Sequence, residues 1–218
     1  MTIQLFGHAF SSYHWKALIA LYENGTPFVF REVGSDPATM DEFGRLSPMG
    51  KFPLLVEGHR VVFEATAIIE YLALYHPGPI ALIPADPKAA LEVRMLDRFF
   101  DNYVMTPMQK VVGDALRPEG GKDPHGVGEA RAQLDKAYAW LEGHLAGRDW
   151  ATGAGFSLAD VAAAPSLFYA DWAHPVDGRF PTVAAYRQRL LARPSVARGV
   201  DEARPFRPYF PLGAPDRD

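Results

Sequence analysis

The stretch PMGKFPLLVEGHRVVFEATAIIEYL, residues 48–72, decides how the N-terminal part of this chain folds. Pro53 opens a short apolar strand, because proline has no N–H for a sheet ladder and suits the first residue of a strand. Residues 57–59 form a turn, and residues 60–63 are predicted to return as the second strand of a hairpin. Apolar side chains then recur at helical spacing over residues 64–75. The stretch therefore predicts a β-hairpin followed directly by a helix.

Two kinds of backbone donor meet in this hairpin and helix. The residue before Pro53 turns its N–H and C=O outwards if the proline kinks the strand. The helix that starts at Glu64 has free N–H groups and the positive end of the helix dipole. Extended backbone beside a helix N-terminus can hold a peptide that carries a carboxylate. A plain hairpin and helix without a ligand is the simpler interpretation, and this stretch alone favours it.

The stretch resembles the glutathione-binding half of the glutathione S-transferase superfamily. SPMGKFPLL at residues 47–55 is similar to the family pattern N-P-x-G-K/Q-V-P-x-L. EATAIIEYL at residues 64–72 is similar to the helix start D/E-S-x-A-I-x-x-Y-L. The resemblance covers nearly the whole chain and points to serine-type bacterial members, with similarity to the zeta, phi and theta branches. It implies an α/β plus all-α architecture, in which a thioredoxin-like domain with Pro53 in cis precedes a helical bundle.

The chain divides into two predicted domains around a proline-rich linker. Residues 1–78 carry strand and helix signals in the order βαβα-ββα, which fits a thioredoxin-like α/β layer. Four prolines lie within residues 77–88, so the linker is placed at residues 79–88. Residues 89–218 carry few strand signals and form the predicted all-helical domain.

Helical spacing organises the predicted second domain. It predicts a long helix over residues 89–116, bent by Pro107, and an amphipathic helix over residues 129–145, with a polar loop between them. Ser157 and Asp160 have the spacing of a capping box, with aspartate in place of glutamate. Asp160 is therefore assigned a structural role.

Composition excludes several classes of protein. The net charge is −4 and no basic patch is concentrated, so no nucleic-acid partner is expected. No apolar run approaches the roughly 20 residues that span a bilayer, and no signal-peptide pattern opens the chain, so we expect a cytoplasmic protein with no membrane partner. The chain has no cysteine, which excludes a cysteine nucleophile, and its seven histidines are scattered, so no metal is expected. Any thiol chemistry must come from a ligand.

Ser11 is the candidate catalytic residue, and Ser12 is the first alternative. Ser11 begins the segment SSYHW, at the predicted N-terminus of the helix after the first strand, where a thioredoxin-like fold places its reactive group. The resemblance implies that the Ser11 hydroxyl donates a hydrogen bond to the sulfur of glutathione and favours the thiolate, which is the nucleophile. The structural alternative is that Ser11 and Ser12 only cap the helix.

Tyr13 is the second alternative. It stands where the similar SSCSWR segment of the zeta branch has a cysteine, which weakens the transfer of that branch's activity, the cis–trans isomerisation of maleylacetoacetate. Tyr13 is either a hydroxyl donor, as tyrosine is in other branches, or an aromatic side chain that packs at the mouth of the cleft.

The resemblance assigns glutathione, the implied co-substrate, to the quoted stretch. Lys51 matches the position that contacts the glycine carboxylate, although a solvated loop lysine is the alternative. The backbone of Phe52, beside Pro53, is expected to pair with the cysteinyl backbone. Glu64 is expected to take the γ-glutamyl ammonium, at a helix N-terminus where an anion is also favoured structurally.

Two residues depart from the family pattern. Ala65 replaces the serine that binds the γ-glutamyl carboxylate, so that carboxylate retains the N–H groups of Ala65 and Thr66 and, if it reaches, the Thr66 hydroxyl. Ala38 stands where many relatives have a histidine. A lost hydrogen bond to a charged group costs about 1.5–3 kcal/mol. The departures therefore predict weak glutathione binding or an altered ligand.

The second substrate is expected to be a small, mostly apolar electrophile between the domains. Family geometry places it near Phe10, Tyr13, Tyr103, Met105 and Met108, with the aromatic segment Phe206–Phe210 of the proline-rich tail as a cover. The predicted function is a homodimeric glutathione transferase of the detoxifying kind. The alternatives are a glutathione-dependent isomerase and, because of Ala65 and Ala38, a non-catalytic binding protein on the same fold.

Overall fold

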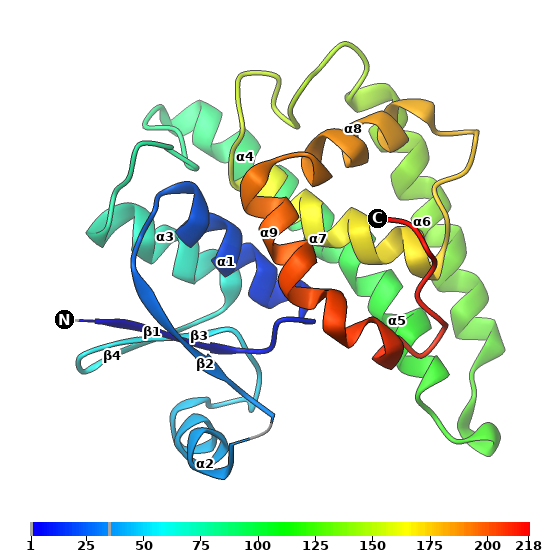
Figure 1. Ribbon diagram of the computed structural model, residues 1–218. Coiled ribbons are helices and arrows are strands. Elements are labelled where there is room, and N and C mark those ends of the chain that lie inside the picture. Colours follow the sequence, from blue (N-terminus) through cyan, green and yellow to red (C-terminus); the bar gives the residue numbers. More distant parts are fainter. Residues whose placement is uncertain (1, 35) are drawn as a thin grey trace.

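The N-terminal domain is a four-stranded sheet with helices on both faces. The computed structural model describes residues 2–34 and 36–218. The strand order is β2-β1-β3-β4, with β2 parallel to β1 and the other pairs antiparallel. Figure 1 shows α1 and α3 on one face of the sheet and α2 on the other. The elements are β1 (Ile3–Gly7), α1 (Ser12–Glu23), β2 (Phe28–Glu32), α2 (Pro37–Leu46), β3 (Leu54–Glu57), β4 (Arg60–Phe63) and α3 (Ala65–Tyr75). The predicted order βαβα-ββα is confirmed.

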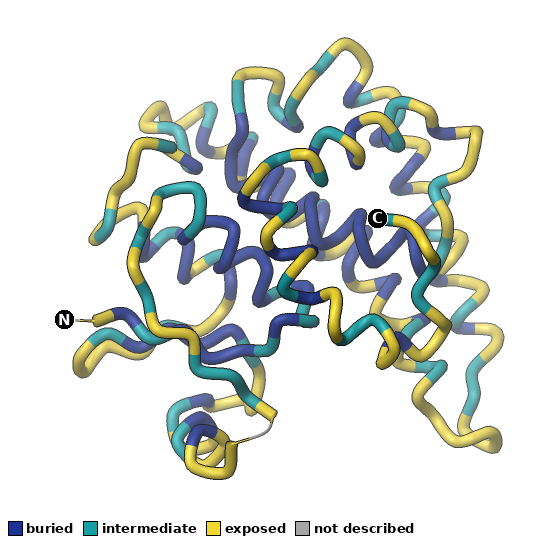
Figure 2. Tube along the Cα trace, viewed as in Figure 1, coloured by how far each residue is buried: buried dark blue, intermediate teal, exposed yellow. Residues whose placement is uncertain are grey.

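The second domain is entirely helical among the described residues. Every residue of α7 is buried, so the other helices pack around it (Figure 2). None of the described helices is long and apolar enough to cross a bilayer. The elements are α4 (Pro87–Phe99), the π-helical stretch η1 (Phe100–Met105), α5 (Thr106–Ala115), the 3₁₀ turn η2 (Glu119–Gly121), α6 (Pro124–His144), α7 (Leu158–Ala173), α8 (Pro181–Leu191), α9 (Pro194–Ala203) and the 3₁₀ turn η3 (Arg204–Tyr209). The predicted fold class, α/β followed by all-α, is confirmed.

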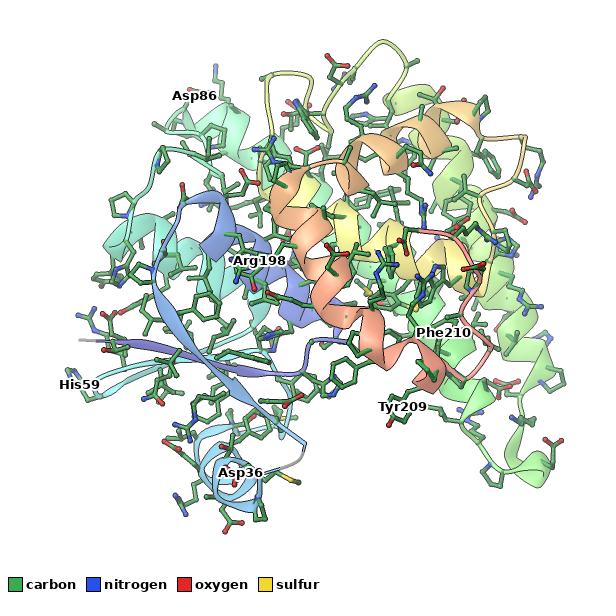
Figure 3. The ribbon with its side chains drawn as sticks, viewed as in Figure 1. Asp36, His59, Asp86, Arg198, Tyr209 and Phe210 are labelled. Carbon is green, nitrogen blue, oxygen red and sulfur yellow. The ribbon has the colours of Figure 1, made fainter. Side chains whose placement is uncertain are left out.

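Three helices start with an aspartate cap followed by proline. The carboxylates of Asp36, Asp86 and Asp123 each accept a hydrogen bond from the backbone N–H three residues on, at 2.8–2.9 Å. Figure 3 labels the first two at the starts of α2 and α4. Proline suits the next position because its missing N–H would be unpaired there anyway. The predicted starts near residues 89 and 129 are therefore wrong, and the helices begin at the prolines.

The long predicted helix over residues 89–116 is interrupted by the π-helical stretch η1. Pro107, in the first turn of α5, has no N–H to donate to the carbonyl of Tyr103. A π-turn is wider than an α-turn, so it shifts the phase of the apolar stripe. Val104 and Met105 are consequently buried in the core, whereas Tyr103 is 49% exposed.

Asp160 has the structural role that the sequence predicts. Its carboxylate accepts hydrogen bonds from the N–H of Ser157 (2.9 Å), the N–H of Ala151 (2.8 Å) and the hydroxyl of Tyr186 (2.6 Å). The bonds join the loop before α7, the start of α7 and α8. Asp160 is fully buried and belongs to neither cavity described below, so its role is in folding.

Lys16 of α1 is fully buried where the two domains meet. Its Nζ donates to Asp97 (2.8 Å), Asp101 (2.8 Å) and the Thr66 hydroxyl (3.2 Å). Arg98 contacts the same three side chains. Two cations and two carboxylates thus balance, as buried charges must if they are to be tolerated. We call these five residues the interdomain cluster. The sequence does not reveal it, since the partners of Lys16 lie 50 to 85 residues away along the chain.

Candidate active site

Two adjoining cavities lie between the domains and share Phe52 and Gln109. We call the cavity of about 450 Å³ the polar pocket and the cavity of about 490 Å³ the apolar pocket. The polar pocket is lined by Tyr13, Ser47, Pro48, Met49, Lys51, Phe52, Pro53, Phe63, Glu64, Ala65, Arg98, Asp101, Asn102 and Gln109. The apolar pocket is lined by His8, Phe10, Ser11, Ser12, Phe52, Met108, Gln109, Val112, Leu116, Tyr169, Tyr209, Phe210 and Pro211.

The loop before β3 leaves the backbone of Phe52 available to a ligand. The peptide bond between Phe52 and Pro53 is cis, as predicted. The Ser47 hydroxyl donates to the C=O of Lys51 (3.0 Å) and accepts from its N–H (3.1 Å), which fixes the loop. Within the described residues, the N–H and C=O of Phe52 have no protein partner. An extended peptide can therefore pair with Phe52 as an added strand would.

Glu64 stands at the start of α3 in an unusual backbone conformation. Its φ is 69°, in the left-handed region that residues other than glycine seldom adopt. Its side chain makes no cap hydrogen bond and lies in the polar pocket beside Ala65. Strained backbone of this kind persists where the surrounding structure requires it, and it is concentrated at ligand sites.

Thr66 is not among the residues that line the polar pocket. Its hydroxyl donates to Asp97 Oδ2 (3.0 Å) and accepts from Lys16 Nζ (3.2 Å) in the interdomain cluster. The structure therefore does not bring this hydroxyl to the position of the missing serine at Ala65. Lys51, Phe52, Pro53, Glu64 and Ala65 are brought together around one cavity.

Ser11 caps α1 and lies on the apolar pocket. Its Oγ accepts from the N–H of His14 at 3.3 Å. Gly7 leaves room for His14, the residue whose N–H makes this bond. A Cβ at position 7 would overlap the imidazole of His14 under the first turn of α1. Ser12 is more deeply buried and lines the same cavity. The capping role of Ser11 is confirmed, and its hydroxyl remains half-buried at the edge of a cavity.

Tyr13 lines the polar pocket instead. Burial raises the pKa of its phenol to about 12, and the negative charge of Asp101 adds to the rise. Its hydroxyl is thus a neutral hydrogen-bond donor at physiological pH. His14 is also a neutral group, because burial, with a smaller contribution from the nearby His8, lowers the pKa of its imidazole to about 3.

The apolar pocket differs in part from the predicted second-substrate site. Phe10 and Met108 line it, but Tyr103 and Met105 do not. The structure does not bring those two residues to the cavity, because the π-turn leaves Tyr103 exposed and buries Met105 in the core.

Residues of α7 and of the C-terminal tail complete this cavity. Tyr169 of α7, Tyr209 at the end of η3 and Phe210 directly after it line the cavity, and Figure 3 labels the last two. The Phe210 ring packs on Trp172 at 5.1 Å between centroids. Tyr209 and Phe210 belong to the tail segment that the sequence predicts as a cover, whereas Tyr169 was missed. The described lining contains no lysine, arginine or carboxylate.

Metal binding finds no support in the described part of the chain. No group of three or more histidine, aspartate or glutamate side chains is placed to hold an ion there.

Comparison with known proteins agrees with this architecture. The family model for the glutathione S-transferase N-terminal domain matches residues 5–79, and the model for the glutathione S-transferase C-terminal domain matches residues 114–189. A probable maleylacetoacetate isomerase of Vibrio cholerae is 29% identical, and the match covers 94% of this chain and 98% of that protein. FtsZ-localized protein A of Caulobacter vibrioides is 33% identical over 81% of each chain.

A solved structure gives the same result. The glutathione S-transferase of Methylobacterium radiotolerans, crystallised in complex with glutathione sulfonate, superimposes with a TM-score of 0.79 at 30% identity. The superposition covers 92% of this chain and 95% of that one. With both family domains matched in order and a related structure aligned almost from end to end, the chain belongs to the glutathione S-transferase family.

Proposed function

We propose that the protein is a glutathione transferase. The observation that carries the proposal is the polar pocket, where the unpartnered backbone of Phe52 lies with Lys51, Glu64 and Arg98. Glutathione has a peptide backbone, two carboxylates and one ammonium. The two cations therefore match the two carboxylates of glutathione, Glu64 matches its ammonium, and the N–H and C=O of Phe52 match its peptide backbone. The relative from Methylobacterium radiotolerans was crystallised with glutathione sulfonate.

The chemistry assigned to Ser11 is stabilisation of the glutathione thiolate. The Ser11 hydroxyl donates to sulfur, and the N-terminal end of α1 favours the negative charge. The thiolate attacks an electrophilic carbon in the apolar pocket, and a carbon–sulfur bond forms. In a substitution the leaving group departs with the electron pair; in an addition the product takes a proton from water.

The apolar pocket favours an uncharged electrophile over a dicarboxylate. The relative from Vibrio cholerae is named as a probable maleylacetoacetate isomerase, which motivates isomerisation as a second candidate. Maleylacetoacetate carries two carboxylates, which call for cationic partners when they leave water. The described lining of the apolar pocket offers no lysine or arginine. Aromatic rings of Phe10, Tyr169 and Phe210 suit an apolar or aromatic substrate instead.

Titration calorimetry with reduced glutathione, followed by a conjugation assay, tests this function. The assay uses an activated aryl chloride for substitution and an isothiocyanate for addition. We expect one glutathione bound per chain and conjugate formed with at least one reagent. Isomerisation of a maleyl compound without loss of glutathione, and no conjugation, would establish the isomerase. A stable protein that binds no glutathione would overturn both and favour a binding protein, a class suggested by the name of the relative from Caulobacter vibrioides.

Tyr13→Phe is expected to lower activity without moving its pH dependence. Because the pKa of Tyr13 is about 12, the phenol is neutral from pH 6 to 9, and the ionisation seen in that range belongs to the glutathione thiol. The measurement is kcat/KM for conjugation against pH in the wild type and the variant. A variant whose apparent pKa shifts would show that Tyr13 itself sets the thiol ionisation.

The proposal includes a homodimer in the cytoplasm, where glutathione keeps thiols reduced. Leu91, Met95 and Tyr103 form an exposed apolar stripe at four- and eight-residue spacing on α4 and η1. Phe99 continues it and packs on Trp140 at 4.4 Å between centroids. A contiguous exposed apolar patch commonly marks a protein interface.

Met95→Glu is expected to convert the dimer into monomers, because it places a charge inside the stripe. Sedimentation velocity across a concentration series measures the change. Leu212→Glu, at a partly exposed leucine of the C-terminal tail, is the matched control and should leave the assembly intact. If Met95→Glu sediments like the wild type, the stripe is not the dimer interface.

A further inference from the structure

The polar pocket lacks a side-chain hydroxyl at the start of α3. Position 65 is alanine, and the Thr66 hydroxyl is engaged in the interdomain cluster. If glutathione binds as proposed above, its γ-glutamyl carboxylate meets only backbone N–H groups on that side. A carboxylate held by so few donors is poorly compensated for the water that it loses. Another donor must come from a different element.

Arg98 of α4 has the geometry for that role. Its Nε donates to Asp97 at 3.0 Å, and its Nη2 donates to Asp101 at 2.9 Å and to the Thr66 hydroxyl at 2.5 Å. Its Nη1 has no protein partner within the described residues. The side chain is 53% exposed and lines the polar pocket with Glu64 and Ala65. Nε and Nη2 are thus anchored, while the two N–H groups of Nη1 keep no protein partner in the described part of the chain.

We propose that Arg98 binds the γ-glutamyl carboxylate of glutathione and replaces the hydroxyl that Ala65 lacks. The inference rests on the proposed function and adds to it a binding residue contributed by the helical domain. The free Nη1 of this cation donates charge-assisted hydrogen bonds, which are stronger than the bond that a neutral hydroxyl would supply.

The charges of the pocket agree with this assignment. Lys51, from the loop before β3, and Arg98, from α4, are its two cations. Glutathione carries one carboxylate on its glycine and one on its γ-glutamyl group, so each cation receives one. Glu64 remains for the ammonium, because Asp101 is already paired with Lys16 and Arg98.

The contacts that hold Arg98 in place favour ligands that carry the γ-glutamyl carboxylate. A free arginine side chain loses rotamer freedom when it binds a ligand, which weakens association. Arg98 is already held by three oxygen-bearing side chains, so it is preorganised. A ligand without the γ-glutamyl carboxylate would gain nothing from it.

The test compares three ligands by titration calorimetry on the full-length protein: glutathione, γ-aminobutyryl-cysteinyl-glycine, which lacks the γ-glutamyl carboxylate, and glutathione with an amidated glycine. Arg98→Gln should lower the affinity for glutathione and for the amide by about ten- to a hundredfold. It should leave the affinity for the aminobutyryl analogue unchanged within error. Lys51→Met should instead lower the affinity for glutathione and for the aminobutyryl analogue, and it should leave the affinity for the amide unchanged. Equal losses of all three ligands on Arg98→Gln, or no loss, would overturn the proposal.

Two further variants separate binding from folding. Arg98→Gln removes one cation from the balanced cluster, so the double variant Arg98→Gln/Asp101→Asn restores neutrality and should keep the same ligand discrimination. Ala65→Ser in the Arg98→Gln background should recover part of the lost glutathione affinity. The charge-balanced double variant should lose affinity for glutathione and the amide but not for the aminobutyryl analogue. If it binds all three ligands as the wild type does, or loses all three equally, the role of Arg98 is refuted even if the single variant is unstable. A wild-type protein that binds no glutathione would refute the proposed function instead.

Discussion

Ser11→Ala is expected to lower kcat/KM for conjugation by about ten- to a hundredfold. The hydroxyl donates to a thiolate, and a hydrogen bond to a charged group is worth about 1.5–3 kcal/mol. The lost bond should also raise the pKa of the bound glutathione thiol, since the thiolate loses stabilisation that the thiol does not share. Thiolate absorbance in the near ultraviolet, followed against pH in the binary complex, measures that pKa directly.

The capping role of Ser11 requires a control, because alanine also removes the hydrogen bond to the N–H of His14. Replacing a serine cap by alanine costs about 1 kcal/mol of stability, whereas glycine costs only a few tenths. Ser11→Gly should therefore lose activity while it melts close to the wild type. Ser12→Ala is the matched neighbour and should keep most activity. Full activity in Ser11→Gly, with a loss in Ser12→Ala, would transfer the role to Ser12.

Lys16→Met is expected to destabilise the fold by about 3–5 kcal/mol, the cost of removing one partner from a buried ion pair. Asp97 and Asp101 would remain in the interface with only Arg98 as counter-ion. Urea unfolding measures the change, with the slope of free energy against urea as a check that the transition stays two-state. Arg94→Met is the matched control. Arg94 also bridges the domains, to Glu70 at 2.7 Å, but this pair is exposed and worth about 0–1 kcal/mol.

The loss in Lys16→Met should depend on pH. Burial raises the pKa of Asp101 in the folded protein, while Lys16 opposes the rise. A carboxyl whose folded pKa exceeds its unfolded value favours the fold below the unfolded pKa, and that contribution declines as pH rises through the folded pKa. Without Lys16 the folded pKa rises further, so the deficit should be smaller at pH 5 than at pH 8. A deficit independent of pH would mean that packing, not charge, is lost.

The sequence predicted correctly the elements that depend on residues close together in the chain. The hairpin after Pro53 and the cap at Asp160 each depend on neighbours within a few residues, and both were found. Asp86 and Asp123 each precede a proline and mark the starts of α4 and α6, which helical spacing alone places too late.

The candidate site was less accessible to sequence reasoning. Lys51, Phe52 and Glu64 lie in one continuous motif, and the structure brings them to one cavity. Tyr103 and Met105 do not line either cavity, because a π-turn changes the helical phase, which periodicity alone does not register. Arg98 and Tyr169 enter from the other domain, and no local pattern ties either residue to the hairpin.

The interdomain cluster also determines where this chain can be recombined with a relative. A crossover in the proline-rich linker looks safe from composition, but it would take Lys16 and Thr66 from one parent and Asp97, Arg98 and Asp101 from another. A chimera built that way inherits mismatched buried charges. A crossover after η1 keeps all five residues in one parental block, so a library of chimeric enzymes should be cut there.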